Sequence, residues 1–287
     1  MKFPKNIPEQ SQSVQPGLEY KMHNPEPITI RPNYKGADKL KDKVALITGG
    51  DSGIGRAVAV HFAREGANVA IVCTDREKKD AEDTRQMVEE EGQECLILIG
   101  DLKDSAFCKI VVELTVKEFG QLDIVVNNAG IHYETKELED ISEKQLTETF
   151  EVNVFSFFHV TQAALKHLKE GASIINTASI VAYRGSESLM DYAATKGAIV
   201  SFTRSLSSNL ASKGIRVNGV APGPIWTPLV VSGRDPEKVK GFGKDTPMER
   251  PGQPCELAPA YVFLACEDSS YITGQVIHVN GGTIINT

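Results

Sequence analysis

The chain has 287 residues, of which 41% are hydrophobic and 24% are charged, and its formal net charge is −7 at pH 7. This length allows one or two domains with an ample core, and the negative charge argues against nucleic-acid or membrane-surface partners. The five cysteines are odd in number and lack metal-ligand spacing, so we expect reduced thiols and no metal site. We also expect a soluble, cytoplasmic protein, since the sequence shows neither a signal peptide nor a membrane-spanning apolar stretch.

Residues 1–40 differ in composition from the rest of the chain. Six of the 14 prolines lie within the first 32 residues, and apolar residues do not recur with a period. We interpret this segment as an irregular N-terminal extension without a core of its own. It is either disordered or laid as an arm over the domain or a neighbouring subunit, and of these we favour the solvated tail.

From residue 41 to residue 287, strand-like and helix-like patterns alternate. Apolar strand-like runs stand at 44–48, 68–73, 94–100, 122–128, 173–179, 215–223 and 274–282, and helical periodicity stands at 77–91, 104–118, 142–168 and 191–212. Such alternation predicts parallel strands joined by right-handed crossovers. We therefore predict an α/β fold with a single Rossmann-type, doubly wound parallel sheet of about seven strands and helices on both faces. The long connection 224–255 is rich in proline and is expected to be a lid or binding loop.

The first predicted strand runs directly into the sequence TGGDSGIG at 48–55. Ligands bind beyond the carboxyl ends of strands in such sheets, and a helix N-terminus attracts phosphate. Gly49, Gly53 and Gly55 have no side chains that would block a pyrophosphate or the contact between helix and strand. A tight turn without a ligand is the alternative, but the strand–loop–helix context favours a dinucleotide site.

Further motifs follow this loop in a recognisable order. They are NNAG at 127–130, Asn153 in FEVNVFSFF, Ser179 after the fifth strand, YAATK with Tyr192 and Lys196, PGPIWTP at 222–228 and ITGQVIHVNGG at 272–282. With the T-G-x-x-x-G-x-G spacing from Thr48 to Gly55, they resemble the classical short-chain dehydrogenase/reductase family over roughly residues 41–287. The N-terminal extension is similar to that of a bacterial subgroup related to glucose/ribitol dehydrogenases and general stress proteins.

Tyr192 and Lys196 form the central pair of the candidate site. Their four-residue spacing places both on one face of a helix. A free phenol has a pKa near 10, and a neighbouring ammonium group lowers that pKa, so Tyr192 could exchange a proton with an alcohol or carbonyl oxygen. The alternative is a pair on a helix surface without chemistry.

Two more residues complete the catalytic set, Asn153 and Ser179. The Ser179 hydroxyl could bond the substrate oxygen, or it could be only a cap; no G-x-S-x-G motif surrounds it, so we exclude a covalent nucleophile. The resemblance implies that Asn153 holds a water linking Lys196 to solvent, and that Lys196 also bonds the ribose of the nicotinamide. A purely structural role is the alternative for Asn153.

The resemblance implies NAD or NADP as the cofactor. The residues expected to bind it are Gly49, Asp51, Ser52, Gly53, Ile54, Gly55, Thr74, Asp101, Leu102, Asn128, Ala129, Gly130, Tyr192, Lys196, Pro222, Gly223, Ile225 and Thr227.

The choice between NAD and NADP stays open at this point. A carboxylate at the end of the second strand would select NAD, but Cys73 and Thr74 stand there. Asp75 argues for NAD and Arg76 for NADP. The negative charge of Asp51 in the glycine loop could disfavour a 2′-phosphate.

These features predict an NAD(P)-dependent oxidoreductase that acts on CH–OH groups of a small alcohol or carbonyl substrate such as a sugar, polyol, aldehyde or ketone. The alternative is a dinucleotide-binding stress or sensor protein with little turnover. The resemblance further implies a homotetramer with helices 142–168 and 191–212 at the interfaces. His132 and Tyr133 are hypothesised to line the pocket, and Trp226 to pack under the lid.

Overall fold

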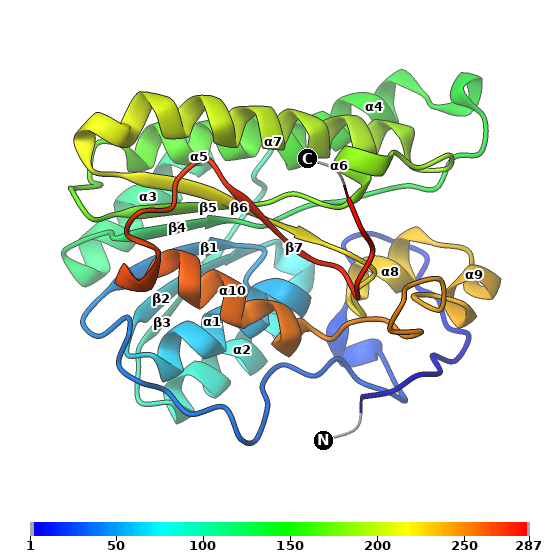
Figure 1. The fold of residues 1–287 in the computed structure, drawn as a ribbon, viewed down its shortest axis with the longest axis horizontal. Helices are drawn as coiled ribbons and strands as arrows, with labels where there is room; N and C mark the ends of the chain where they lie inside the picture. Colours follow the sequence, from blue (N-terminus) through cyan, green and yellow to red (C-terminus); the bar gives the residue numbers. More distant parts are fainter. Residues whose placement is uncertain (1–2, 286–287) are drawn as a thin grey trace.

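The computed structural model describes residues 3–285 of the chain and confirms the predicted doubly wound sheet (Figure 1). Within these residues, seven parallel strands form one sheet in the order β3-β2-β1-β4-β5-β6-β7. The strands are β1 (Val44–Thr48), β2 (Asn68–Cys73), β3 (Cys95–Ile99), β4 (Ile124–Asn127), β5 (Ser173–Thr177), β6 (Arg216–Pro222) and β7 (Val276–Val279). Strand order reverses between β1 and β4, where a crevice for a ligand is expected.

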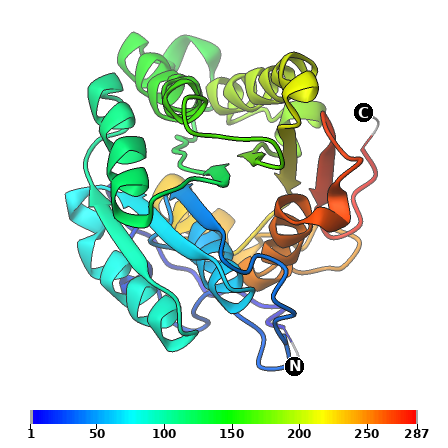
Figure 2. The same ribbon diagram turned by 90° about the vertical axis from the view of Figure 1, so that its left-hand side faces the viewer.

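Helices cover both faces of the sheet, as Figures 1 and 2 show from two directions. One face carries α1 (Gly53–Arg64), α2 (Lys78–Glu90) and α10 (Pro254–Ala265). The other carries α3 (Ser105–Phe119), α4 (Glu143–Phe150), α5 (Ser156–Ala164) and α7 (Met190–Leu210), with the short α6 (Val181–Arg184) before α7. A last pair, α8 (Pro228–Gly233) and α9 (Pro236–Lys240), lies beyond the carboxyl end of β6.

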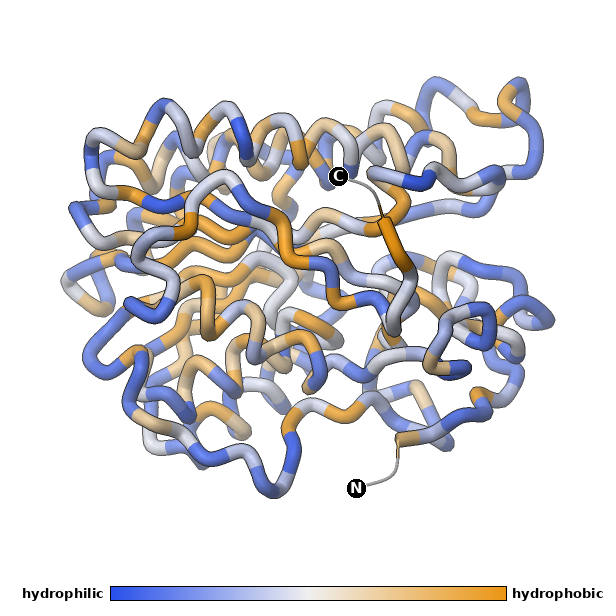
Figure 3. Tube along the Cα trace, viewed as in Figure 1, coloured by the Kyte–Doolittle hydropathy of each residue, from blue (hydrophilic) through white to orange (hydrophobic). Residues whose placement is uncertain are grey.

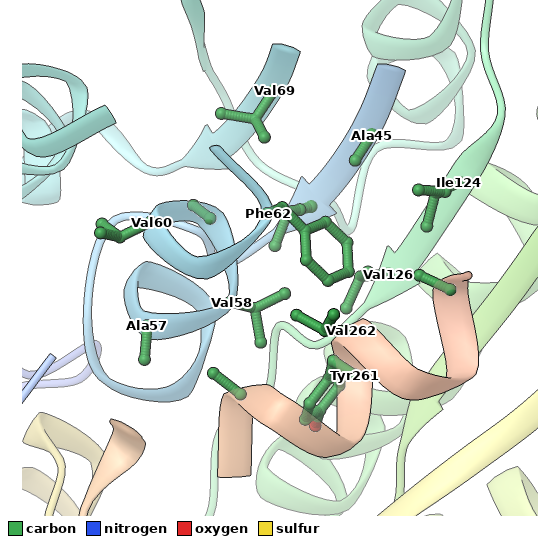
Figure 4. Packing of buried hydrophobic residues seen from close by; sticks show 14 of the residues in the cluster. Ala45, Ala57, Val58, Val60, Phe62, Val69, Ile124, Val126, Tyr261 and Val262 are labelled. Carbon is green, nitrogen blue, oxygen red and sulfur yellow. The ribbon is translucent and has the colours of Figure 1, made fainter. Parts of the chain in front are cut away.

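Each face of the sheet packs its own hydrophobic core. On the α1 and α10 side, Phe62 and Val58 of α1 lie beside Val262 of α10 (Figure 4). Fully burying one side chain of this size is worth roughly 1.5–3 kcal/mol. Because strands β1, β2, β4 and β5 are buried on both faces, hydrophobic residues concentrate in the centre of the molecule (Figure 3).

The predicted helix 142–168 is interrupted in the structure. A stretch of π-helix, Glu151–Phe155, separates α4 from α5, and Asn153 lies fully buried within it. Helical periodicity alone does not reveal a π-bulge, because the bulge adds one residue to a turn without changing the apolar pattern on either side.

Two predicted strands end earlier than expected. Ser179 and Asp101 each follow the last residue of their strand by two positions.

The N-terminal segment is an arm laid over the domain, not the solvated tail that we favoured. It passes beside α8 and α9 in Figure 1. Ile7 and Met22 of the arm form a small hydrophobic cluster with Trp226, Val230, Val231 and Val239. The arm has no core of its own, but burial against the 224–255 connection supplies the free energy that orders it.

Trp226 illustrates how the arm and the connection share a core. Its side chain is fully buried, and its indole Nε1 donates a hydrogen bond to the carbonyl oxygen of Pro25, 2.7 Å away.

Within residues 3–285, no helix is long and apolar enough to cross a membrane. Across the same residues, no three His, Cys, Asp or Glu side chains are grouped to hold a metal ion.

Candidate active site

A cavity of about 670 Å³ lies at the carboxyl ends of the strands. It is lined by all but two of the residues that the sequence placed in the site, from loops after β1, β2, β3, β4, β5 and β6. The two exceptions contact residues that do line it: Gly55 packs against Gly49, and Asn153 is hydrogen-bonded to Ile131. The tertiary structure therefore brings the predicted catalytic and cofactor-binding residues into one place.

The glycine-rich loop packs too closely for a side chain at Gly55 and has a left-handed backbone at Gly49 and Gly53. A Cβ built at Gly55 would stand 1.8 Å from the carbonyl oxygen of Gly49, and Gly49 and Gly53 have φ values of +60° and +53°. A Cβ at Gly53 would lie 3.1 Å from Thr227. The loop thus packs tightly at the N-terminus of α1, where helix geometry favours an anion.

Asn128 holds the strand ends that frame the cavity. Its side-chain Nδ2 donates to the carbonyl oxygens of Thr48 and Gly49, at 3.1 and 3.0 Å, and its Oδ1 accepts a hydrogen bond from Thr177 at 3.2 Å. These contacts link the ends of β1, β4 and β5. Asn128 therefore fixes the crevice at the point where strand order reverses.

Tyr192, Lys196 and Ser179 line the same cavity, and the Ser179 side chain is hydrogen-bonded to Tyr192. The Lys196 Nζ lies 5.5 Å from the centroid of the Tyr192 ring and donates a hydrogen bond to the Thr177 carbonyl oxygen at 2.8 Å. Lys196 is almost fully buried, and burial lowers its pKa to about 7.

The expected lowering of the Tyr192 pKa is wrong for this structure. Desolvation in the cavity raises that pKa to about 12, and it outweighs the opposing effects of a hydrogen bond from Ser179 and of the Arg234 charge. Tyr192 is therefore a protonated phenol at neutral pH, ready to donate. Lys196, with a pKa near neutrality, can take up and release a proton in the same range.

Asn153 supports the wall behind Lys196. Its Oδ1 accepts from the Ile131 amide at 2.8 Å, and its Nδ2 donates to the Ile131 carbonyl oxygen at 2.9 Å and to Thr195 at 3.1 Å. A Cβ at Gly130 would lie 3.3 Å from Asn153 Oδ1 and 3.7 Å from Lys196 Nζ, so the two side chains flank that glycine. The π-bulge turns the amide inward to this position.

The end of the cavity after β2 differs from the charge pattern that we expected. Asp51 is 1% exposed, and burial, reinforced by the nearby Glu77, raises the pKa of its carboxyl well above the usual value. Asp51 is therefore not expected to repel a 2′-phosphate, because burial disfavours a negative charge on its carboxyl group. Thr74 directs its amide and hydroxyl to Glu77 Oε2, whereas the exposed Arg76 lines the cavity.

The arm supplies a part of the cavity wall that the sequence did not predict. Gln15, Pro16 and Gly17 line the cavity, and Glu19 reaches the glycine-rich loop, where its carboxylate accepts from the Gly53 amide at 2.6 Å. Glu19 also pairs with Arg56 at 2.6 Å. These residues stand in a polar, non-periodic stretch, so no local pattern marks them as part of a site.

Comparison with known proteins gives relatives along nearly the whole chain. The protein family described as "Enoyl-(Acyl carrier protein) reductase" matches residues 49–283. General stress protein 39 of Bacillus subtilis is 55% identical over 285 residues, covering 99% of each chain. The NADPH-dependent aldehyde reductase 1 of Arabidopsis thaliana is 53% identical over 96% of this chain and 98% of its own, and the glucose and ribitol dehydrogenase of Daucus carota is 52% identical over 98% of both.

Solved structures show the same architecture. A short-chain dehydrogenase from Burkholderia cenocepacia, in complex with NADP, matches with a TM-score of 0.80 at 32% identity, over 85% of this chain and 98% of that one. A 3-ketoacyl-(acyl-carrier-protein) reductase from Brucella melitensis, complexed with NADH, matches with a TM-score of 0.77 at 36% identity and the same coverage. In both cases about 15% of this chain lies outside the match.

Proposed function

Because this chain belongs to the short-chain dehydrogenase/reductase family of oxidoreductases, we propose that it transfers a hydride between NAD or NADP and an alcohol or carbonyl substrate. One observation carries the proposal: Tyr192, Ser179 and Lys196 line the same cavity as the glycine-rich loop. A proton donor and a dinucleotide cradle thus share one space, as a carbonyl reduction requires.

The residues of the cavity fit a dinucleotide. The glycine-rich loop has no room for a side chain at Gly55, is left-handed at Gly53, and lies at the N-terminus of the 12-residue helix α1, an arrangement suited to a pyrophosphate. Thr227 would close this cradle from the other side, and Asp101 would lie near the adenine. When bound, the nicotinamide supplies or accepts the hydride.

The chain itself handles the proton. Tyr192, protonated at neutral pH, would donate to the carbonyl oxygen of the substrate while Ser179 holds that oxygen. Lys196 would then return a proton to the phenolate, because its pKa of about 7 permits exchange near neutrality. Asn153, beside Gly130 and Lys196, would orient a water for that exchange. The same groups act in reverse when an alcohol is oxidised.

Assays with both cofactors test this function. We expect the purified protein to consume NADPH or NADH with one or more members of a panel of aldehydes, sugars and ketones, measured by absorbance of the reduced nicotinamide. The competing function is a stress or sensor protein with little turnover; one Bacillus subtilis relative is named General stress protein 39. Tight cofactor binding without consumption across the panel would support that second function instead.

We also propose a homotetramer in the cytoplasm. Phe158 of α5 and Phe202 of α7 stack at 4.0 Å between ring centroids, and Phe158 is 39% exposed. These are the helices that the resemblance places at subunit interfaces, and a second copy would cover the pair. The five cysteines are free thiols, which suits a reducing compartment.

Arg76 is expected to influence the choice between the two cofactors. The residue is exposed and lines the cavity, as does Thr74 two positions earlier in the chain. A guanidinium group in this part of the cavity is suited to bind the 2′-phosphate of NADP. We expect Arg76→Ala to lower the ratio of kcat/KM for NADPH to that for NADH by about tenfold, the worth of one charge-assisted hydrogen bond. An unchanged ratio would exclude this contact.

A further inference from the structure

Arg234 is a charged cavity residue that the mechanism above does not use. It follows α8 directly, lines the cavity and keeps 25% of its side chain exposed. A Cβ at the neighbouring Gly233 would lie 2.8 Å from Cε1 of His132, and the His132 ring lies 5.4 Å from the ring of Tyr192, centroid to centroid. The backbone that carries Arg234 is therefore only one side chain away from the proposed proton donor.

The electrostatic reach of Arg234 agrees with this placement. Burial lowers the pKa of His132, and the Arg234 charge lowers it further. Burial raises the pKa of Tyr192, and the same charge is among the effects that oppose this rise. Arg234 is thus close enough to a carbonyl compound beside Tyr192 to bind a second group of that compound.

Two contacts hold the guanidinium of Arg234 but leave part of it free. Its Nη1 donates to Glu134 Oε1 at 3.1 Å, and its central carbon lies 5.2 Å from the centroid of the Phe242 ring. Nε and Nη2 make no hydrogen bond within residues 3–285, and neither nitrogen is buried. These donors of a planar, permanently charged group are available to a ligand.

Arg250 has the same surroundings but leaves no such donors at the end of its guanidinium. It also lies over a phenylalanine, with its central carbon 4.7 Å from the centroid of the Phe3 ring, and it also pairs with a glutamate. Both of its Nη nitrogens donate to Glu256, at 2.7 and 2.8 Å, and Arg250 does not line the cavity. Arg234 makes one such bond where Arg250 makes two, so support of the fold does not account for its free donors.

The charges in this part of the cavity wall favour an anion. Apart from Lys196, residues 181–245 place four charged side chains in the wall. They are the cations Arg184, Arg234 and Lys238 and the acid Asp245. Glu134 pairs with both Arg234 and Lys238 and adds a second carboxylate. One positive charge is left over, and a cavity lined by an excess of one sign attracts a ligand of the other.

The position of Arg234 also separates it from the proposed pyrophosphate site. Thr227, which a Cβ at Gly53 would approach to 3.1 Å, directly precedes α8, and Arg234 directly follows it. The six residues of α8 span about 9 Å. Arg234 therefore lies at the opposite end of α8 from the glycine-rich loop, on the side of Tyr192.

We propose that Arg234 is a specificity-determining residue that binds an anionic group, a carboxylate or a phosphate, on the part of the substrate away from the reacting carbonyl. The preferred substrate class is then short aldehydes or ketones that carry a negative charge, over their neutral analogues. The anionic group would be bound unchanged, because only the carbonyl carbon receives the hydride and only its oxygen receives the proton of Tyr192. This inference rests on the proposed function.

Two pairs of aldehydes test the preference for charge. Succinic semialdehyde carries a carboxylate, and 4-methylpentanal has methyl groups in place of its two carboxylate oxygens; glyceraldehyde 3-phosphate and glyceraldehyde differ only in the phosphate. The readout is the ratio of kcat/KM for the anionic member to that for the neutral member. We expect the wild type to prefer the anion in at least one pair, which identifies the anionic group.

Variants of Arg234 then assign that preference to the guanidinium. Arg234→Met keeps most of the side-chain length without the charge, and we expect it to lower the ratio of the responding pair at least tenfold. Arg234→Lys keeps the charge but not the planar fork, so its ratio should fall between those of the wild type and Arg234→Met. Because each ratio is taken within one variant, a general loss of folded protein cancels.

Arg250→Met is the matched control. It removes an arginine that lies over a phenylalanine and pairs with a glutamate, but outside the cavity. We expect both ratios to equal those of the wild type. Equal changes in Arg250→Met and Arg234→Met would overturn the inference.

The remaining outcomes separate this inference from the proposed function. A wild type that reduces aldehydes but prefers the neutral member of both pairs would overturn the inference while the proposed function stands. Unchanged ratios in Arg234→Met would do the same, and a weaker dissociation constant of the cofactor in that variant would then assign the guanidinium to the cofactor. If the wild type reduces no aldehyde or ketone with either cofactor, the proposed function fails, and this specificity fails with it.

Discussion

Tyr192→Phe is expected to lower kcat for aldehyde reduction by about 10²–10⁴-fold, the range that a positioned acid contributes. The variant removes only the hydroxyl that would donate the proton. Since Phe keeps the ring beside Lys196 and His132, the dissociation constant of the cofactor should change less than about threefold. Steady-state kinetics and a fluorescence titration of the reduced cofactor measure the two quantities separately.

Tyr183→Phe is the matched control for that experiment. Tyr183 is absent from the cavity wall, and its buried hydroxyl has no partner within residues 3–285. Removing it should leave kcat unchanged and the stability unchanged or slightly greater. Equal residual rates in the wild type and Tyr192→Phe would contradict the catalytic role and favour the sensor function.

Gly55→Ala is expected to abolish cofactor binding and to destabilise the domain by about 1–3 kcal/mol or more. The added Cβ would stand 1.8 Å from the Gly49 oxygen and 2.8 Å from Asn128 Nδ2, and both of these groups hold the glycine-rich loop against β4. The backbone must shift to remove this overlap, so the proposed pyrophosphate site would be lost. Thermal unfolding and cofactor titration report the two effects.

Gly197→Ala provides the control for Gly55→Ala. Gly197 lies within α7, directly after Lys196, and a Cβ there would meet no atom within 4 Å. Alanine is the better helix former, so this variant should be more stable by about 0.5–1 kcal/mol and should bind cofactor normally. If Gly55→Ala bound cofactor as tightly as Gly197→Ala, the glycine-rich loop would not be the pyrophosphate site.

Local spacing was enough to predict the architecture and most members of the candidate site. The apolar runs predicted a parallel sheet because strands buried on both faces need apolar residues at successive positions. The loop from Thr48 to Gly55 was recognisable because its close packing admits only glycine at fixed positions. Tyr192 and Lys196 were recognisable because four residues make about one turn of a helix.

Electrostatics inside the cavity depended on burial and not on spacing. The sequence suggested that Lys196 lowers the pKa of Tyr192 and that Asp51 carries a charge. In the structure, desolvation raises the pKa of Tyr192 and of Asp51, and lowers the pKa of Lys196. A pKa depends on how much water surrounds the group, which no sequence pattern reports.

The sequence by itself determined the fold class, the glycine-rich cradle and the tyrosine–lysine pair, since each rests on periodicity or on spacing within a single turn or loop. Only the tertiary structure showed that Gln15, Pro16 and Gly17 of the arm line the cavity. Gln15 meets His132, and Glu19 meets Gly53, across 117 and 34 positions of the chain. Such contacts arise where an arm without a period of its own finds apolar surface to cover, and that surface exists only once the domain has folded.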